Sequence, residues 1–438
     1  MMENKIVIRN FGPVKEAEIN LDNKFQIFIG AQASGKSTIC KIVYFCQKIR
    51  DYTLDFLMDS EQFTQNHQNE YFNNYLKYLT RKFMGCFGTT KHMPRFSIEY
   101  TIGHNRININ LNTDGYVRFL FDNSLKSEIC ALINQASDMF LNRLNNDEVS
   151  TIMDNITAIG VMKRHLKDVL FDIFQNDVEV IYIPAGRSLL ATMSEQLYDV
   201  SISHMDLTMQ EFINLIRTTK SKFGCKIPEM VKNYTKTVKG QINNAAIDQA
   251  YLLIKKILKA DYTNESDGEK IYFDENHWVK LMYGSSGQQE VLWILMLVFI
   301  AILEKKKSFI VIEEPEAHLF PIAQKDIISL ISLMVNVTNS SIIITTHSPY
   351  ILTSTNILLY SDKVESMQGK ELKTIIPKNL RVSYDTFAAY KVGNFNETMV
   401  SLLDAESHMI STDYIDEVSS ITNLELDELI NMEINNDL

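Results

Sequence analysis

The sequence predicts an α/β protein, and three observations support this class. A glycine-rich loop at 30–38 follows an apolar strand at 25–29 and precedes residues with helical spacing. Two later apolar runs, at 309–312 and 341–345, have the continuous hydrophobicity of strands that are buried on both faces. Long helical stretches lie between these strands, and such alternation is typical of a sheet covered by helices.

The first part of the chain also predicts an antiparallel meander. Two short strands are joined through the turn Phe11-Gly12-Pro13, and three later strands are separated by turns that contain glycine or asparagine. These strands are expected at 6–9, 17–21, 96–101, 107–112 and 117–121.

The rest of the chain predicts helices interrupted by single strands. Helices are expected over 124–175, over most of 190–260 and at about 322–336. A strand at 178–183 ends in the sequence Pro184-Ala185-Gly186-Arg187. Further strands are expected at 270–273, near 279–282, at 341–345 and near 357–360.

Composition predicts a globular cytoplasmic protein that is independent of membranes. The 438 residues carry a net charge of −11, but residues 401–438 contain ten acidic residues and neither Lys nor Arg, so the remainder is close to neutral. The five cysteines lack paired metal-ligand spacing, which favours reduced thiols. The N-terminus has no signal-peptide pattern, and the longest apolar run, at 291–303, is too short to span a bilayer.

The loop at 30–38 fits the phosphate-binding pattern GxxxxGK[ST], known as Walker A. Its members are Gly30, Ala31, Gln32, Ala33, Ser34, Gly35, Lys36, Ser37 and Thr38. Backbone amides in such a loop form an anion site at a helix N-terminus. Lys36 is expected to reach the β and γ phosphates of ATP, and Ser37 is expected to coordinate Mg²⁺. The alternative, a chance glycine turn, is disfavoured by the strand before the loop and the helix after it.

Two glutamates follow the apolar strand at 309–312, at the edge where ligands gather in open α/β sheets. Glu313 is expected to hold the Mg²⁺ shell. Glu314 is expected to orient and deprotonate the attacking water. Taken alone, such a pair would more often be a solvated strand end. The phosphate loop upstream favours the catalytic interpretation, which is the Walker B arrangement.

The strand at 341–345 delivers a histidine to the same edge of the sheet. The imidazole of His347 could contact a γ phosphate and sense its loss, although an isolated histidine is usually structural or solvent-exposed. For His318, a role at a subunit interface and simple solvent exposure remain equal alternatives.

Four segments in order resemble the ABC-type ATPases of the SMC, RecF and OLD group: 30–38, 285–290, 313–319 and 346–349. The opening Ile8-Arg9-Asn10-Phe11-Gly12-Pro13-Val14 is similar to the N-terminal strand and turn of that group. The resemblance implies an ABC-type ATPase head, a P-loop NTPase in which two ATP molecules lie between two heads. Each ATP would then contact one Walker A loop and the signature of the partner, so the protein would form a homodimer or higher oligomer.

The signature is carried by Ser285, Ser286, Gly287 and Gln288. Against the family form LSGGQ, Gly284 and Ser286 are departures, and Glu313 replaces the more usual aspartate. Together with EEPEAHL at 313–319, these departures resemble OLD-like ATPases more than membrane transporters. The family also uses a Q-loop glutamine, for which Gln47 is a weak candidate.

These motifs suggest four regions. Residues 1–123 would form an ATPase lobe with Walker A and antiparallel strands, and 124–275 a mostly helical insertion region with one core strand. Residues 276–365 would supply the signature, Walker B and His347, and 366–438 an acidic C-terminal segment.

The expected function is regulation of a separately encoded effector. The C-terminal segment is too short for the Toprim nuclease domain of OLD proteins, and no heptad tract predicts a long SMC arm. Short ATPases with a strand end like 182–187 resemble subunits of the anti-phage systems PARIS and Septu, in which the partner is a nuclease. A RecF-like DNA-repair ATPase is the alternative.

Two further segments have open interpretations. The stretch 217–259 holds ten basic residues against two acidic ones and could contact nucleic acid or a phage protein, but a solvated helix face is slightly favoured. The acidic tail could dock a partner or serve as a solubilising end, and its spaced apolar residues favour a packed helix.

Overall fold

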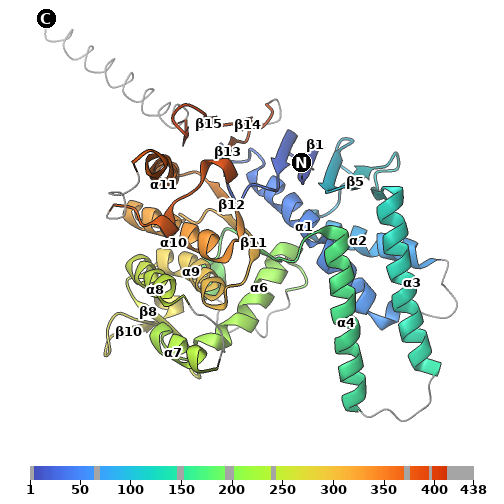
Figure 1. Ribbon diagram of the computed structural model, residues 1–438, viewed down its shortest axis with the longest axis horizontal. Coiled ribbons are helices and arrows are strands. Elements are labelled where there is room, and N and C mark those ends of the chain that lie inside the picture. Colours follow the sequence, from blue (N-terminus) through green and yellow to red (C-terminus); the bar gives the residue numbers. More distant parts are fainter. Residues whose placement is uncertain are drawn as a thin grey trace, which may run out of the picture.

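The computed structural model describes residues 4–63, 70–145, 152–192, 202–237, 243–368, 375–393 and 397–411. Its centre is a six-stranded sheet with the order β14-β13-β3-β12-β11-β7, parallel except for β14 (Figure 1). The strands are β3 (Phe25–Ile29), β7 (Glu179–Ile183), β11 (Ser308–Glu313), β12 (Ser341–Thr346), β13 (Phe387–Lys391) and β14 (Val400–Ser401). This confirms the predicted α/β class.

The register of the parallel strands brings their carboxyl ends to one edge of the sheet. Thr346 pairs with Ile29, Glu313 pairs with Thr345, and Ile312 pairs with Ile183. The residues that follow these strands therefore meet at the same edge, as expected for ligand sites in open α/β sheets.

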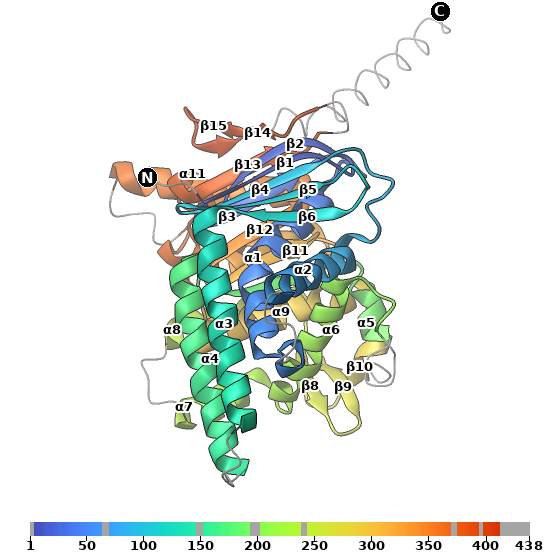
Figure 2. The ribbon, with the colours of Figure 1, turned by 90° about the vertical axis from the view of Figure 1, so that its right-hand side faces the viewer.

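A second sheet is antiparallel and lies above α1 (Lys36–Met58) and α2 (Tyr71–Phe87) in Figure 2. Its order is β2-β1-β4-β5-β6, which confirms the predicted N-terminal meander. The strands are β1 (Lys5–Phe11), β2 (Val14–Asn20), β4 (Ser97–Ile102), β5 (Asn105–Leu111) and β6 (Val117–Phe121). Smaller sheets are formed by β8 (Asp261–Glu265), β9 (Gly268–Tyr272) and β10 (Trp278–Lys280), and by β15 (Leu403–Asp404) and β16 (Met409–Ile410).

Side chains alternate between the two faces of the central sheet and so contribute to two cores. Ile27 and Ile344 belong to the core formed with α8 (Asn244–Leu258), α9 (Ser286–Glu304) and α10 (Pro321–Thr338). Phe28 and Ile343 belong to the core formed with α1 and the antiparallel sheet. The helices are α1 (Lys36–Met58), α2 (Tyr71–Phe87), α3 (Asn123–Asn145), α4 (Ile152–Phe174), α5 (Ser188–Thr192), α6 (Leu207–Thr219), α7 (Ile227–Thr237), α8 (Asn244–Leu258), α9 (Ser286–Glu304), α10 (Pro321–Thr338) and α11 (Pro349–Gln368).

Helix α9 is long and apolar enough to cross a membrane by length and composition alone. However, 78% of its apolar window is buried inside the protein. Its residues from Val291 to Leu303 are all buried and pack between the central sheet and neighbouring helices. The helix therefore serves as the central core helix of this fold.

One predicted strand is wrong. The apolar run at 357–360 lies in helix α11, whose buried residues Ile351, Leu352, Leu358 and Leu359 recur at helical spacing. A run of four apolar residues fits a buried helix as well as a strand, and here Pro349 at the first helical position favours the helix.

Among the described residues, five strands were not expected from the sequence: β8, β13, β14, β15 and β16. β13 joins the central sheet beside β3, although it comes from the segment 366–438. β8 completes the small sheet with β9 and β10. The helix suggested for the acidic tail lies outside the described residues, which end at 411.

Candidate nucleotide-binding site

The loop at 30–38 connects β3 to α1 at the carboxyl edge of the central sheet. Two of its residues have a left-handed backbone, Ala33 with φ 62° and Gly35 with φ 101°. A Cβ on Gly35 would lie 2.8 Å from the Val14 side chain, so this position also requires glycine for space. Ala31, Gln32 and Ala33 are exposed, as is Ser37 at the start of α1. The loop thus has the form of a backbone anion site at a helix N-terminus.

Lys36 turns its ammonium back onto the loop. Its Nζ donates hydrogen bonds to the carbonyl oxygens of Gly30 and Ala31, both at 2.9 Å. Burial lowers the pKa of this lysine, and the nearby carboxylates of Glu314, Glu316 and Glu313 oppose the shift. The same carboxylates and that of Glu290 also surround the buried Arg187, so four carboxylates face two cationic side chains, and this balance suits a nucleotide bound together with a divalent cation.

The residues of the loop fit a nucleotide phosphate. The hydroxyl of Ser34 is buried and has no hydrogen-bond partner within the described chain, although buried polar groups are normally paired. Ser37 presents an exposed hydroxyl to the same surface. With the carboxylate of Glu313, this hydroxyl would supply the hard oxygen donors that Mg²⁺ prefers. The cation would neutralise charge on the phosphates.

Gly30 lies against Val392, the residue that follows β13. A Cβ at this position would lie 2.5 Å from the carbonyl oxygen of Val392, which is rigid backbone hydrogen-bonded through its own amide to Ile29. We expect Gly30→Ala to shift the loop and weaken ATP binding by about tenfold or more, in proportion to a lost charge-assisted hydrogen bond. The measurement is titration of a fluorescent ATP analogue. Gly160→Ala in α4 is the matched control, because that glycine, like Gly30, lacks a positive φ, but a Cβ there would have no neighbour within 4 Å. Equal affinities for the two variants would contradict the prediction.

Glu313 is almost fully buried, and both of its carboxylate oxygens are hydrogen-bonded. Oε1 accepts from the Tyr182 hydroxyl at 2.8 Å, and Oε2 accepts from the amide of Ala185 at 3.0 Å. Both donors come from the end of β7. These bonds fix the orientation of the carboxylate next to the loop, and its remaining lone pairs could bind a cation directly or through water.

Glu314 follows Glu313 in an unusual backbone conformation, with φ 44°. Its amide donates to the carbonyl oxygen of Thr345 at 3.0 Å and lies 3.2 Å from the hydroxyl of the same residue. Its Oε1 lies 3.3 Å from Nε2 of His347, and both side chains remain about 40% exposed. The structure therefore brings two of the expected catalytic residues together and leaves both accessible to a substrate.

Glu316 is a site residue that sequence analysis did not select. Its Oε1 accepts hydrogen bonds from the Thr346 hydroxyl at 2.6 Å and from the amide of His347 at 2.8 Å. Burial raises the pKa of this carboxyl group. It ties the turn after β11 to the end of β12 and so fixes the backbone of His347. Its position in EEPEAHL offered a signal, but the first two glutamates of that motif already accounted for the expected chemistry.

The signature caps helix α9. The Ser285 hydroxyl accepts from the amide of Gln288 at 3.3 Å, and Oε1 of Gln288 accepts from the amide of Ser285 at 3.0 Å, which forms a capping box. A Cβ on Gly287 would lie 2.7 Å from the carbonyl oxygen of His318, so the signature packs against the turn after β11. Among the described residues, no hydrogen bond joins the signature to the loop at 30–38. His318 itself is exposed.

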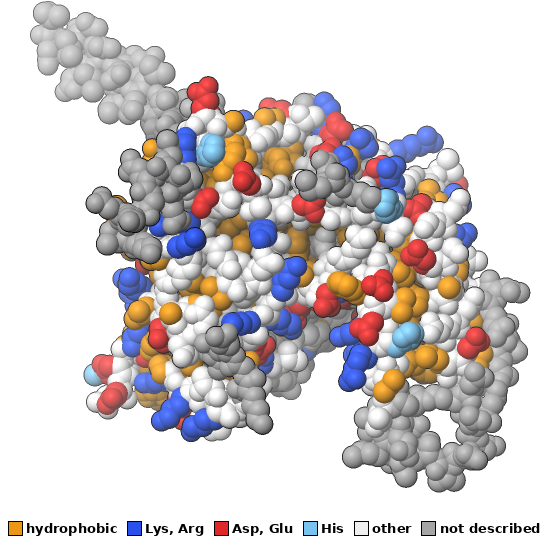
Figure 3. Space-filling view, viewed as in Figure 1, with side chains coloured by type: hydrophobic (Ala, Val, Ile, Leu, Met, Phe, Trp, Pro, Cys, Tyr) orange, Lys and Arg blue, Asp and Glu red, His pale blue; other side chains and the backbone are white. Residues whose placement is uncertain are grey.

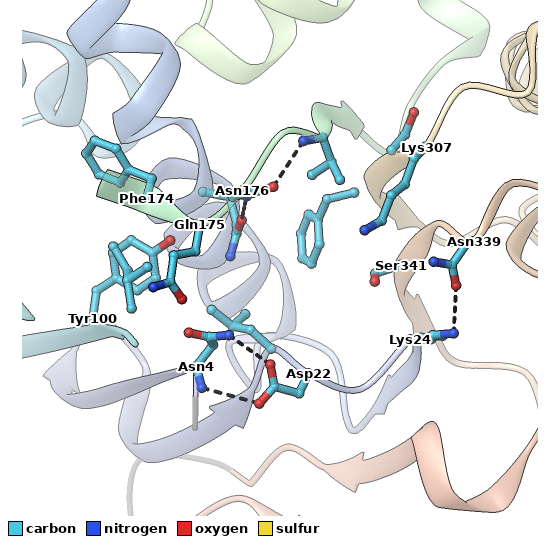
Figure 4. Close-up of a pocket in the computed structure, with 16 residues that line it drawn as sticks. Asn4, Asp22, Lys24, Tyr100, Phe174, Gln175, Asn176, Lys307, Asn339 and Ser341 are labelled. Atoms are coloured by element: carbon cyan, nitrogen blue, oxygen red, sulfur yellow. Dashed lines mark hydrogen bonds between the residues drawn. The ribbon is translucent and has the colours of Figure 1, made fainter. Parts of the chain in front are cut away.

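Gln47 does not belong to this site. It is buried within α1, and its side-chain oxygen accepts from Asn176 at 2.6 Å. It lines a cavity of about 250 Å³ at the opposite edge of the sheet, shown in Figure 4 with Lys24 and Ser341 at the amino ends of their strands. Because Walker A lies at the carboxyl edge, the Q-loop assignment is wrong, and this cavity is not the nucleotide site.

The basic stretch 217–259 is partly engaged within the fold. Lys222 pairs with Glu304, Lys255 pairs with Asp261, and the Lys226 ammonium lies 4.9 Å from the centre of an aromatic ring. Figure 3 shows basic side chains mixed with acidic ones over the part of this face that α7 and α8 occupy in Figure 1. Lys239 lies outside the described residues.

Several solved structures are similar to this chain. An SMC head bound to the C-winged helix domain of ScpA has 12% identity and a TM-score of 0.38, and the match covers 93% of this chain and 99% of that one. The SMC head domain from Thermotoga maritima has 10% identity and a TM-score of 0.37, and the match covers 92% of this chain and 100% of that one. A third structure is an Smc head domain with an extended coiled coil, bound to the C-terminal domain of ScpA derived from Pyrococcus furiosus. It has 14% identity and a TM-score of 0.38, and the match covers 91% of this chain and 96% of that one. The comparison with curated proteins gives no significant match.

Family comparison agrees with the site. The family described as AAA ATPase domain matches residues 1–352, which include the phosphate loop, the signature, both glutamates and His347. This match extends over more than half of the 438 residues. Members of such a family bind nucleotides, in agreement with the loop geometry and the charge of the site. The chain therefore belongs to the AAA ATPase domain family.

Proposed function

We propose that this protein hydrolyses ATP with Mg²⁺. The observation that carries the proposal is the pair Glu314 and His347, 3.3 Å apart beside the phosphate loop. Glu314 would accept a proton from the attacking water, and His347 would donate a hydrogen bond to the γ phosphate. When ATP binds, the Lys36 ammonium would exchange its hydrogen bonds to the carbonyl oxygens of Gly30 and Ala31 for hydrogen bonds to the β and γ phosphates. Positioning and electrostatics would provide most of the rate enhancement.

We propose further that ATP is held between two copies of the chain. Ser285 and Ser286 are exposed on the surface. Large apolar side chains near the signature are also exposed, including Tyr283 at 72% and Phe320 at 76%. Apolar side chains gathered on a surface favour an association site. In a two-fold dimer, each signature would reach the nucleotide bound by the partner.

A mixing experiment tests this arrangement. Lys36→Met removes the phosphate-binding lysine, and Ser285→Glu places a negative charge at the proposed γ-phosphate contact. Each variant alone is expected to lose hydrolysis. An equal mixture is expected to recover about a quarter of wild-type activity, because half of the dimers then contain one intact composite site.

The control is Asn243→Glu, which alters the capping residue of α8, where the Asn243 side chain accepts from the amide of Ala246 at 3.2 Å. This variant should keep full activity, because it changes a helix cap without touching the site. If the mixture stays inactive while each variant remains folded, each site works within one chain and the shared-site proposal fails.

We propose that the ATP-driven association controls a separate effector, a nuclease in anti-phage defence. The support is the resemblance of 182–187 and of the four motifs to the ATPase subunits of PARIS and Septu. The test is phage challenge of cells that carry the native locus, with Glu314→Gln as the inactive variant, together with pull-down of the bound effector. Equal plaque counts for both strains would remove the defence role. ATPase stimulation by DNA that is lost on charge reversal at Lys232 and Lys236 would favour the RecF-like alternative.

A further inference from the structure

Arg187 is a fully buried arginine at the end of β7, with an exposed fraction of 0%. Its guanidinium group donates to four carbonyl oxygens on three different segments. Nε donates to the backbone carbonyl oxygen of Glu290 in α9 at 2.8 Å. Nη1 donates to the carbonyl oxygens of Pro184 at 2.6 Å and Glu313 at 2.7 Å, and Nη2 donates to that of Glu314 at 2.9 Å. A single side chain therefore joins three segments. These are the end of β7, the helix α9 that begins with the signature (the signature helix), and the turn after β11 that carries Glu313 and Glu314 (the Walker B turn).

Glu290 completes the connection from the side of the signature. Its carboxylate accepts from the amides of Arg187 and Ser188, both at 3.0 Å, and lies 3.4 Å from Nε of Arg187. Glu290 is buried in α9, five residues after the capping Ser285. A regular helix transmits a displacement of its first turn as a rigid element, so a shift at Ser285 would be passed to Glu290.

The other end of the connection is the backbone of Glu314. A non-glycine residue with φ 44° is held in a sparsely populated conformation that persists only where the surroundings fix it. Here the amide of Glu314 donates to Thr345, and its carbonyl oxygen accepts from Arg187 and, at 3.1 Å, from the amide of Ala317. Loss of the bond to Arg187 would leave this carbonyl oxygen with only the Ala317 amide of the same turn, and would let the carboxylate of Glu314 leave its position.

A buried ion pair often contributes little to the stability of a fold, because apolar replacements of both partners are frequently neutral or stabilising. The hydrogen-bond geometry of Arg187 therefore indicates its role better than its charge does. The planar fork of arginine reaches two consecutive carbonyl oxygens of the Walker B turn and the signature helix at once, which a lysine cannot do.

We propose that Arg187 is a positioning residue that, together with Glu290, couples the signature helix to the backbone of Glu314. This inference rests on the proposed ATP hydrolysis. In the wild type, contact between the signature and the nucleotide would fix the position of α9. Through its hydrogen bonds to Glu290 and Glu314, Arg187 would then fix the position of the residue that activates water. Arg187 itself touches neither nucleotide nor water.

Kinetics test the coupling with Arg187→Lys and Glu290→Gln. Each is expected to lower kcat for ATP hydrolysis by about 10-fold to 100-fold and to change KM by less than about threefold, because the nucleotide contacts at 30–38 are untouched. The matched control is Arg381→Lys. Arg381 is also buried, and its guanidinium donates to the carbonyl oxygen of Ile376, away from the site. This control should keep wild-type kcat.

Hydrogen exchange tests the coupling without nucleotide. In Glu290→Gln, the amides of Glu314 and Ala317 are expected to exchange at least about threefold faster than in the wild type, since the turn loses its support from Arg187. Amides of the antiparallel sheet should be unchanged. Glu290→Gln also keeps the inference testable if Arg187→Lys fails to fold.

The outcomes separate the two proposals. A wild-type protein without turnover would refute ATP hydrolysis, while the exchange experiment would still report on the connection. Wild-type turnover together with unchanged kcat in both variants would overturn the positioning role, even if exchange increased. A general loss of melting temperature with equal changes in KM and kcat would show a purely structural pair and would also overturn it.

Discussion

Glu314→Gln is expected to lower the rate of ATP hydrolysis by about 10²-fold to 10⁴-fold, the range typical of a lost general base. Glutamine keeps the size and the polar character of the side chain but cannot accept the proton of the attacking water. ATP binding should persist because the loop at 30–38 is unchanged, so the variant should accumulate the ATP-bound dimer. Phosphate release measures turnover, and light scattering with and without ATP measures mass.

The matched control is Glu304→Gln, which removes a carboxylate that pairs with Lys222 at the surface end of α9. Its turnover should match that of the wild type. Wild-type hydrolysis by Glu314→Gln would contradict the assignment of the base and would direct attention to Glu316, the neighbouring carboxylate that is tied to His347.

Lys36→Met is expected to weaken ATP binding by about 10-fold to 100-fold, since a hydrogen bond to a charged group contributes about 1.5–3 kcal/mol. The stability of the fold should change little, because two effects oppose each other. An apolar side chain of similar length removes the desolvation penalty of the buried ammonium, whose pKa is lowered by that burial. It also deprives the carbonyl oxygens of Gly30 and Ala31 of this donor, so melting curves without nucleotide should give a midpoint close to that of the wild type.

Isothermal titration with ATP and Mg²⁺ measures the affinity. Lys41→Met serves as the control, because Lys41 lies on the same helix but pairs with Asp206 of the adjacent α6 region at 3.3 Å. A Lys36→Met protein that binds ATP as tightly as the Lys41→Met protein would show that the loop does not hold the phosphates.

Much of the central sheet could be predicted because its signals are local. Continuous apolar runs identified β11 and β12, and glycine turns identified the antiparallel meander. The prediction of a strand at 357–360 is wrong for the same reason, because four consecutive apolar residues show neither the strand period nor the helix period. Pairing partners distant in sequence decided that β13 belongs beside β3, and no local pattern encodes such a pairing.

The candidate site shows the same division. The spacing of Gly30, Gly35 and Lys36 specified the phosphate loop, and Glu314 and His347 were selected from the ends of their strands. The prediction for Gln47 is wrong because a glutamine in a helix gives no sign of which edge of the sheet it faces. The sequence shows Arg187 only as a residue after a strand, because its partners Glu290 and Glu314 lie more than a hundred residues away.

The phosphate loop and the polar residues at the strand ends can be identified from the sequence, because these short motifs contain the residue types that a nucleotide requires. The connections between the motifs depend on the folded chain. The parallel register places Glu314 beside His347, the end of β13 packs against Gly30, and the buried guanidinium of Arg187 joins α9 to the turn after β11. Contacts of this kind depend on burial and on hydrogen bonds between distant segments, which exist only once the chain has folded.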